Sequence, residues 1–201
     1  MGKTKIPDNY KKICKKAGKL TNPVLTANAV PDKEIIIDGE KIEYKFPWAT
    51  HLSDEESKWV FDLFRRNMFN MYQMSLDGWD EGHKKQELFA TTSRYIIIKN
   101  NKNKYMGYAH YRFDIDGGLP VLYLYELQVE SFVQNKGIGS IIVEMIEKTA
   151  KYLEMKKVVC TVFAFNSQSL AFFHKNGYTT DETCPGADDG VDYLILSKKF
   201  D

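Results

Sequence analysis

The residues best suited to chemistry lie in one short loop, residues 133–140, between an apolar segment and an amphipathic one. Gly137 and Gly139 let the backbone curl so that several N–H groups converge, and a helix expected from about Ile138 adds the positive end of its dipole. The loop therefore predicts a diphosphate site. A glycine pair before a helix is also ordinary turn chemistry, so the loop alone leaves both interpretations open.

The order of residues in this loop narrows the choice of ligand. A nucleoside-triphosphate loop ends in Gly-Lys-Ser/Thr, whereas here Lys136 precedes Gly137. A dinucleotide fold needs three glycines in the order GxGxxG, and this loop has only two. The remaining pattern, Gln134-x-x-Gly137-x-Gly139, resembles the acetyl-CoA signature of the GCN5-related N-acetyltransferase superfamily. The resemblance implies acetyl-CoA as co-substrate.

Composition sets the frame for that site. A chain of 201 residues, 43% of them hydrophobic, is long enough for one sizeable core and too short to favour two. Residues 1–20 carry a charge of about +6 and the remainder about −5. We predict a basic N-terminal arm over residues 1–40 and one domain over residues 41–201. No aromatic-rich basic face accompanies the arm, so direct nucleic-acid binding is not expected.

Several classes of protein are excluded by what the sequence lacks. No stretch approaches the apolar length of a membrane span, and no apolar segment follows the lysine-rich start, so we expect neither membrane insertion nor secretion. Cys14, Cys160 and Cys184 lack close pairs and histidine partners, which argues against a disulfide framework and against a metal site.

The elements that must position the loop change in type along the chain. A capping box at residues 53–56 predicts a helix to about Ser75, followed by a loop over residues 76–85 and a short helix. Strands are expected at residues 95–98, 105–114 and 121–129, then a helix from 138, a strand at 157–163, a helix at 167–176 and a strand at 191–196. This order predicts an α/β fold with a mixed central sheet flanked by helices.

Longer stretches are similar to a narrower family. Residues 111–116 (YRFDID), 123–131 (YLYELQVES), 155–163 (MKKVVCTVF) and 193–197 (YLILS) resemble N-alpha-acetyltransferase D, the histone-specific N-terminal acetyltransferase family. The similarity spans roughly residues 55–198. It implies a single N-acetyltransferase domain with an N-terminal helical arm, which acetylates the α-amino group of histones four and two-A at tails beginning Ser-Gly-Arg-Gly. Histone tails as partners, a monomer, and a location in nucleus and cytoplasm are the corresponding expectations.

Glu126 is the best candidate for the general base that such chemistry needs. An α-amino group has a pKa of about 8, so only about a tenth is the free nucleophile at neutral pH. Glu126 lies in an otherwise apolar strand near the loop, where burial would raise its pKa, and the family places the aligned glutamate in the active site. From the strand pattern alone, an outward-facing solvated glutamate stays open.

Tyr125 is the second catalytic candidate, as a phenol that orients the amine or its water. Strict alternation sends Tyr125 and Glu126 to opposite faces, so a bulge must bring them together. The alternative is a tyrosine of the core. Phe173 stands where many superfamily members carry the tyrosine that protonates the leaving thiolate. The thiolate would therefore leave unassisted or take its proton from Tyr125 or water.

The resemblance also implies a peptide groove. Asp114 and Asp116 share a strand face before a Gly-Gly turn, and the family role of such a pair is to receive the third-position arginine. Their plain alternative is turn capping. Asp77 departs from the family, which commonly has a second tryptophan there. The other groove positions carried over are Tyr72, Trp79, Tyr123, Thr161 and Tyr193.

The cofactor positions follow the same resemblance. The backbone of Leu127, Gln128 and Val129 should pair with the pantetheine arm as an added strand does. Asn166 resembles the family asparagine that contacts the cofactor, or simply leads into the next helix. The N–H groups expected to hold the pyrophosphate belong to Gln134, Asn135, Lys136, Gly137, Ile138, Gly139 and Ser140.

Two other functions remain open at this point. One is acetylation of a different amine, such as a lysine side chain or a polyamine, which an acidic groove would also suit. The other is a non-catalytic acetyl-CoA-binding module, which would be favoured if Glu126 lay far from the thioester.

Overall fold

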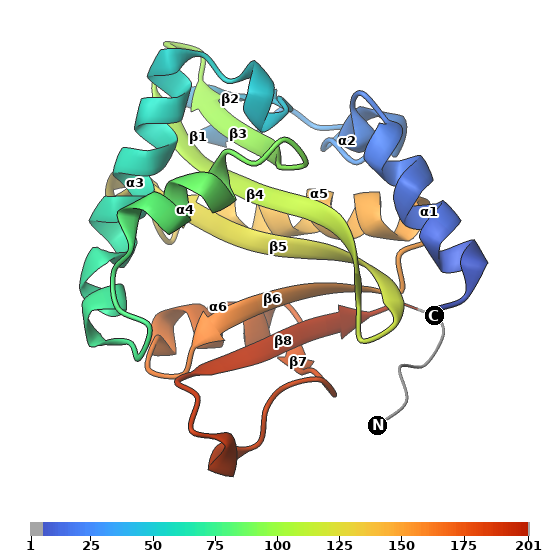
Figure 1. The fold of residues 1–201 in the computed structure, drawn as a ribbon. Helices are drawn as coiled ribbons and strands as arrows, with labels where there is room; N and C mark the ends of the chain where they lie inside the picture. The colour runs from blue at the N-terminus through green and yellow to red at the C-terminus, as the bar shows by residue number, and fades with distance from the viewer. Residues whose placement is uncertain (1–5, 201) are drawn as a thin grey trace. The chain divides into compact units, whose positions relative to one another are not determined.

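A computed structural model describes residues 6–200; residues 1–5, where the predicted arm begins, and Asp201 lie outside the described part. Short 3₁₀ turns occur at Ala49–His51, Ser131–Val133 and Ala187–Asp189. The helices and strands, labelled in Figure 1, are α1 (Asp8–Lys19), α2 (Pro23–Thr26), β1 (Ile36–Ile37), β2 (Glu40–Lys45), α3 (Asp54–Met74), α4 (Glu81–Leu88), β3 (Arg94–Asn100), β4 (Tyr105–Asp116), β5 (Leu119–Val129), α5 (Ile138–Tyr152), β6 (Lys157–Phe163), α6 (Ser167–Lys175), β7 (Thr179–Thr180) and β8 (Tyr193–Lys199).

The strands form one eight-stranded sheet in the order β1-β2-β3-β4-β5-β6-β8-β7. β5 and β6 are parallel where residues 121–123 pair with residues 157–159. β1–β2, β2–β3, β3–β4, β6–β8 and β7–β8 are antiparallel. The predicted α/β class with a mixed sheet is confirmed, as is a helix in the N-terminal arm.

The chain divides into two compact units. One comprises residues 31–111 and 125–143, and the other comprises the residues up to 30 with residues 112–124 and 144 onward. β4, β5 and α5 therefore each contribute residues to both units. The predicted boundary between residues 40 and 41 stays a prediction.

The first unit is organised by α3. Ser53 Oγ accepts a hydrogen bond from the Glu56 N–H at 3.1 Å, and Glu56 Oε2 accepts one from the Ser53 N–H at 3.0 Å, which completes the predicted capping box. The apolar stripe of α3 then packs with Leu88 of α4 on one face of β3 and β4. The core residues of this layer are Ala49, Val60, Phe61, Leu63, Phe64, Leu88, Tyr95, Ile97 and Tyr108.

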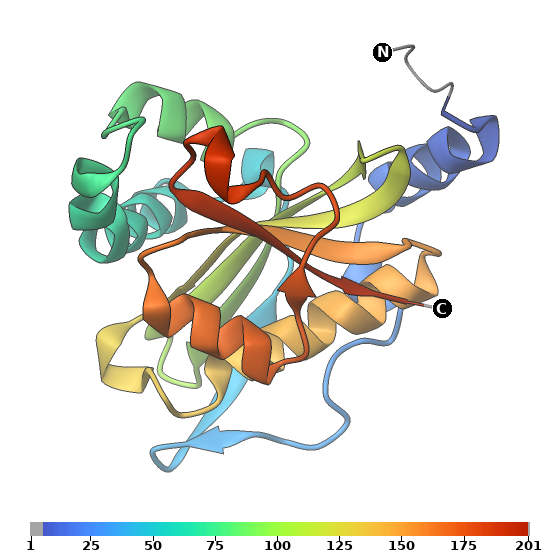
Figure 2. The same cartoon turned by 90° about the horizontal axis from the view of Figure 1, so that it is seen from below.

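The second unit is held by a buried ion pair. β6 and β8 pair over seven residues, and α6 and the end of α5 lie on one side of them (Figure 2). Lys157 Nζ of β6 contacts both carboxylate oxygens of Asp181, at 2.8 and 2.7 Å, and the two side chains are 1% and 0% exposed. Asp181 Oδ1 also accepts hydrogen bonds from the N–H and hydroxyl of Thr183. The pair thus fixes the loop before β8.

Three sequence predictions need correction. The predicted loop over residues 76–85 ends at Asp80, whose side chain caps α4 by accepting from the His83 N–H at 2.8 Å. β1, β2 and β7 were not predicted, because β1 and β7 have two residues each and β2 carries charged residues on its exposed face. The last strand begins at Tyr193 and extends to Lys199, because its polar end still pairs with β6.

Membrane insertion was not expected, and across residues 6–200 no helix has the length and apolar character that a bilayer span requires.

The buried pair makes stability depend on acidity. Burial alone would raise the pKa of Asp181, but hydrogen bonds from Lys157, Ser197 and Thr183 outweigh it and hold this pKa below its ordinary value. A lowered pKa in the folded state stabilises the protein above the unfolded pKa of about 3.9, and that contribution is lost progressively as the pH falls from there through the lowered folded-state pKa. Asp181→Asn should cost about 3 kcal/mol or more at pH 7. Urea unfolding should show the gap from wild type narrowing below about pH 4.

Glu182→Gln is the matched control, since its pair with Lys199 is more than half exposed and should contribute less than about 1 kcal/mol. An Asp181→Asn variant with wild-type stability at pH 7 would contradict the assignment.

Candidate active site

Glu126 is buried in the layer between the sheet and α4. Its side chain is 8% exposed. Oε1 contacts Lys84 Nζ at 2.7 Å, and Oε2 accepts a hydrogen bond from Gln128 Nε2 at 2.8 Å. Burial raises the pKa of Glu126, even though Lys84 and Gln128 favour its charged form. The alternative of an outward-facing solvated glutamate is therefore wrong, and this carboxylate is more basic than an ordinary one.

Tyr125 and Glu126 both reach the helix-covered side of β5. The Tyr125 ring stacks on His110 at 5.1 Å, and His110 stacks on Tyr95 of that same layer at 5.3 Å. Two consecutive residues on one face depart from strict alternation. This is the arrangement for which we predicted a bulge.

The hydrogen bonds at the end of β5 agree with an extra residue. The two-residue turn at Gly117 and Gly118 has positive φ at both residues, +54° and +80°, as in a hairpin that places Asp116 opposite Leu119. The Glu130 N–H donates to the Met106 carbonyl at 2.9 Å. Between these two points β5 has one residue more than β4, which is the definition of a bulge.

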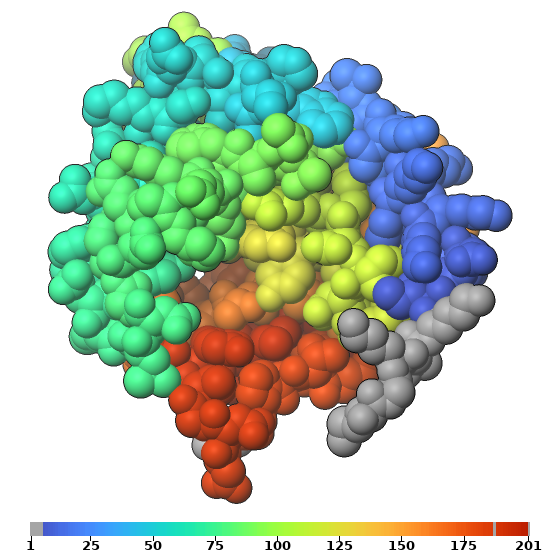
Figure 3. Space-filling model, in the orientation of Figure 1, coloured from blue at the N-terminus to red at the C-terminus, as the bar shows by residue number. Residues whose placement is uncertain are grey.

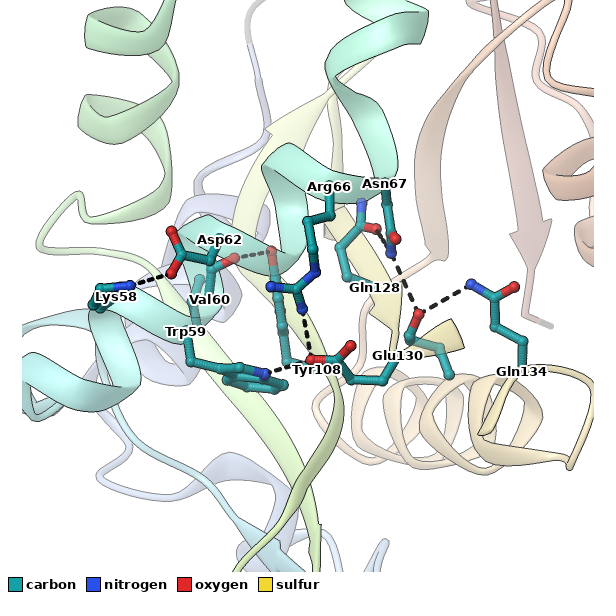
Figure 4. Close-up of polar contacts among 11 residues, drawn as sticks. Lys58, Trp59, Val60, Asp62, Arg66, Asn67, Tyr108, Gln128, Glu130 and Gln134 are labelled. Carbon is teal, nitrogen blue, oxygen red and sulfur yellow. Dashed lines mark hydrogen bonds and ion pairs between the residues drawn. The ribbon is translucent and has the colours of Figure 1, made fainter. Parts of the chain in front are cut away.

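Side chains of α3 hold the end of β5, as Figure 4 shows. Trp59 Nε1 and Arg66 both donate to Glu130 Oε1, at 2.9 and 2.7 Å. Asn67 Nδ2 donates to Gln128 Oε1 at 3.0 Å. Gln128 therefore connects α3 to Glu126 through its two amide atoms, so its side chain positions the carboxylate.

The Val129 carbonyl already has two donors. Asn67 Nδ2 lies 3.3 Å from it and Gln134 Nε2 lies 3.1 Å from it. A carbonyl oxygen has two lone pairs, so a ligand would compete for this one. The expected strand-like pairing with pantetheine then falls mainly to Leu127 and Gln128.

The glycine loop has the backbone of an anion cradle. Asn135 and Gly137 have positive φ, +61° and +90°, and the α5 helix begins at Ile138. When left-handed residues such as these are interspersed with residues of ordinary negative φ, successive backbone N–H groups turn toward one side. A Cβ atom built on Gly137 meets no heavy atom of its surroundings within 4 Å, so the space beside it can take a ligand.

The side chains of this loop differ in their availability. Ile138 is buried, and Ser140 is exposed. Lys136 Nζ forms an ion pair with Asp38 at 2.6 Å. Gln134 turns back onto its own strand, as described above. The loop therefore offers backbone N–H groups rather than a free cation.

Tyr72 of α3 and Trp79 of the loop after it belong to one aromatic cluster. Trp79 contacts the rings of Phe64, Phe69 and Tyr72 at 5.7, 5.1 and 5.9 Å. Both residues are half-buried, and burial raises the pKa of Tyr72 to about 12. They pack on the core and keep part of their surface accessible. Asp77 nearby is exposed.

The two aspartates of the hairpin differ in environment. Asp114 is exposed, and its Oδ1 accepts from the Ile115 N–H at 2.7 Å. Asp116 is half-buried, and its Oδ2 is shielded without a hydrogen-bond partner among the described residues. A shielded carboxylate oxygen without a donor suits a cationic ligand. The sequence placed both on one face but could not show this difference.

Two other parts of the second unit position this hairpin. Gly117 lies against Thr183 so closely that an added Cβ would approach its methyl group to 2.8 Å. The Cys14 thiol of α1 donates to the Asp114 carbonyl at 3.2 Å. In Figure 3 the blue residues of α1 lie beside the yellow-green residues of the hairpin.

The remaining groove candidates share a sheet face. Tyr123 pairs with Val159 on β6, and Tyr193 pairs with Phe163, so alternation places Tyr123, Thr161 and Tyr193 on the same side. Tyr123 and Thr161 hydroxyls lie 2.6 Å apart. The structure brings these three predicted residues together.

Two residues near the α6 helix have structural roles. Asn166 is buried, and its side-chain oxygen caps α6 by accepting from the Ser169 N–H at 3.1 Å. Its amide nitrogen is the part that could meet a cofactor. Phe173 is buried against Tyr178, with ring centroids 5.2 Å apart, and so fills the core where a superfamily acid would stand.

Sequence reasoning gave no role in the site to Lys84 or to Asn67. Lys84 fell in the predicted loop, so its face could not be assigned. The spacing of Lys84 and Glu87, three residues apart, is the signal that could have found the pair. Asn67 sits at helical spacing between apolar residues of α3, and a polar residue there is a cue for a buried hydrogen bond.

Comparisons with known proteins agree with this geometry. The Acetyltransferase (GNAT) family matches residues 41–178. Uncharacterized protein YdhI of Bacillus subtilis is 28% identical over 61 residues, which cover 30% of this chain and 38% of that protein. This chain therefore spans well under half the length of that curated relative.

Solved structures with a similar fold have low sequence identity. Arabidopsis thaliana Naa50, bound to the bisubstrate analogue CoA-Ac-MVNAL, is 16% identical with a TM-score of 0.56, over 79% of this chain and 99% of that one. The PaiA N-acetyltransferase of Thermoplasma acidophilum in complex with coenzyme A is 17% identical with a TM-score of 0.56, over 79% of this chain and 99% of that one. A chain of the NatC complex, bound to Gag peptide and CoA, is 15% identical with a TM-score of 0.59, over 80% and 99%.

These structures show the fold. The family match, residues 41–178, covers more than half of the sequence and runs from β2 to just beyond α6. The chain belongs to the acetyltransferase (GNAT) family.

Proposed function

We propose that this protein transfers an acetyl group from acetyl-CoA to the α-amino group of a peptide that begins Ser-Gly-Arg-Gly, as histone four and histone two-A do. The observation that carries the proposal is the buried Glu126, a carboxylate with a raised pKa on the strand that leads into the glycine loop. A base of this kind removes the proton that keeps an α-amine from acting as a nucleophile.

Acetyl-CoA supplies the activated acetyl group as a thioester. The N–H groups of residues 134–140 would hold its pyrophosphate, and the cradle fits this group because Gly137 leaves open space beside a helix start. Glu126 would take the ammonium proton directly or through one water. As the amine nitrogen bonds to the acetyl carbon, the carbon–sulfur bond breaks and the coenzyme A thiolate leaves. Tyr125 would orient the amine or protonate that thiolate, because Phe173 has no proton to donate.

Peptide specificity rests on residues of the second unit. Asp116 offers a shielded oxygen and Asp114 an exposed carboxylate, and a guanidinium can bind two such acceptors with its fork of donors. Tyr123, Thr161 and Tyr193 would line a groove on their shared face, and the expected roles of Tyr72 and Trp79 stay predictions. The Naa50 and NatC structures were both solved with peptide-containing ligands, which favours a peptide substrate here too.

A lysine side chain or a polyamine is the second candidate substrate, because acidic groove residues would accept those cations as well. Mass spectrometry of Ser-Gly-Arg-Gly peptides, compared with the same peptides carrying an acetylated Ser, distinguishes the two. With histone tails as partners, the protein would act in the nucleus and the cytoplasm. We expect it to act as a monomer.

Glu126→Gln should lower kcat by about 100-fold or more, because a general base contributes two to four orders of magnitude. The affinity for acetyl-CoA should change little, since the cradle is separate. Steady-state kinetics and calorimetry measure the two quantities. Glu144→Gln, at an exposed site on α5, is the control. Wild-type turnover by Glu126→Gln from pH 6 to 9 would remove Glu126 from the mechanism.

Gly137→Val should abolish measurable acetyl-CoA binding. The φ of +90° disfavours any side chain, and a branched Cβ would occupy the space beside the cradle. Gly190→Val tests strain alone, because Gly190 also has positive φ, +69°, and open space around it. Calorimetry on both folded variants decides: equal affinities for acetyl-CoA would refute the cradle.

Replacing the third-position arginine of the peptide by alanine should lower kcat/KM. The loss should correspond to about 2 kcal/mol or more of transition-state binding free energy, since the change leaves Asp114 and Asp116 without their cation. Asp114→Ala should then lose more activity on the arginine peptide than on the alanine peptide. Asp188→Ala, in the exposed 3₁₀ turn, controls for net charge. Strictly additive losses in this double-mutant cycle would mean that the aspartates only cap the turn.

A further inference from the structure

Lys84 is a buried cation on the inner face of α4. Its side chain is 10% exposed. Nζ contacts Glu126 Oε1 at 2.7 Å and Glu87 Oε1 at 2.6 Å, and it lies 4.7 Å from the Phe64 ring centroid and 5.4 Å from that of Tyr72. The ammonium group is therefore enclosed by two carboxylates and two aromatic rings.

Packing alone does not explain a lysine at this position. A buried ion pair is often no more stable than apolar residues of similar volume, because removing two charges from water is costly. The surrounding layer is aromatic and aliphatic, and a methionine would fit its chemistry. A cation at this position has a clear use where the carboxylate that it contacts must stay charged.

We propose that Lys84 is a positioning residue for acetyl transfer, which keeps the Glu126 carboxylate ionised and fixes its orientation. This inference rests on the proposed role of Glu126 as the base. One oxygen of Glu126 is held by Lys84, and the other by Gln128, which Asn67 holds in turn. The carboxylate is thus anchored from both α4 and α3.

Lys84 itself does not act as the base. Burial alone would lower the pKa of Lys84, but the negative charge of Glu126 and the neighbouring acidic groups outweigh it and raise this pKa above the ordinary value. Lys84 therefore keeps its proton over the working pH range. In the transfer, the proton leaves the substrate ammonium for the Glu126 carboxylate, while the charge of Lys84 stays constant.

The other groups that face Glu126 cannot replace this cation. Glu87 of α4 is an acid and raises the pKa of Glu126 further. Tyr72 of α3 and Tyr108 of β4 have pKa values raised by burial, so both phenols stay neutral. Gln128 carries no charge. Lys84 is the cation that the described structure places against this carboxylate.

The test compares Lys84→Met with Lys84→Arg. Without the cation, the pKa of Glu126 should rise, so the acid limb of the kcat/KM profile should move to higher pH, with about a 10-fold loss of kcat/KM on that limb. The loss should shrink toward pH 9, where the carboxylate is ionised again. Lys84→Arg keeps the charge and should restore most of the activity and the position of the limb.

A measurement without substrate separates this proposal from the role of Glu126. The pKa of Glu126 can be followed by NMR of carboxyl-labelled glutamate, with Glu126→Gln to assign the signal. Lys84→Met should raise that pKa, and Glu87→Gln should lower it, because it removes a negative neighbour. Glu87→Gln creates no unpaired buried cation, so it remains informative if Lys84→Met does not fold.

Lys85→Met is the control, since Lys85 is the next residue of α4 but is half-exposed and pairs with Glu81 at 2.6 Å. It should leave both the pKa of Glu126 and the profile unchanged. An unchanged pKa of Glu126 in both Lys84→Met and Glu87→Gln would overturn the proposal. Full activity of Glu126→Gln would instead refute the base, while the NMR result would still decide whether Lys84 controls this carboxylate.

Discussion

The need to keep a carboxylate charged while it is buried shapes the first unit. Glu126 lies in the middle of an apolar strand, and burial of an isolated charge there would neutralise it. Two groups contact this carboxylate, the Lys84 ammonium of α4 and the Gln128 amide of β5. The amide is itself hydrogen-bonded to Asn67 of α3. The positions of both helices on the sheet, the capping of α4 by Asp80 and the extra residue of β5 serve to bring these groups to one point.

Much of the fold could be predicted because its signals are local. The capping box of α3, the glycine turn between β4 and β5, and the apolar period of α5 are read within a few residues, and each element lies where it was expected. Short or charged elements were missed, because β1, β7 and β2 exist only through pairing with neighbours. Their sequences alone have no strand pattern strong enough to be recognised.

The sequence was enough to identify several candidate residues of the site, but not the side chains that contact them. Glu126, Tyr125 and the glycine loop follow from position, chemistry and family resemblance. The contact of Lys84 with Glu126 spans 42 residues of sequence, so no local pattern contains it. The same holds for Asn67 with Gln128 and for Cys14 with Asp114. Lys136 was expected to contribute only its backbone N–H, and its ion pair with Asp38, 98 residues away, was equally beyond any local pattern.

The position of α1 has a consequence for the origin of selectivity. The family match begins at residue 41, whereas α1 ends at Lys19 and contacts the hairpin that bears Asp114. The hairpin that we propose to receive the substrate arginine is thus braced by a segment outside the residues that the family matches. Relatives with the same framework but another leading segment could differ in substrate preference with every groove residue identical. Grafting this helix, rather than exchanging groove residues, is then the engineering route to transfer that preference.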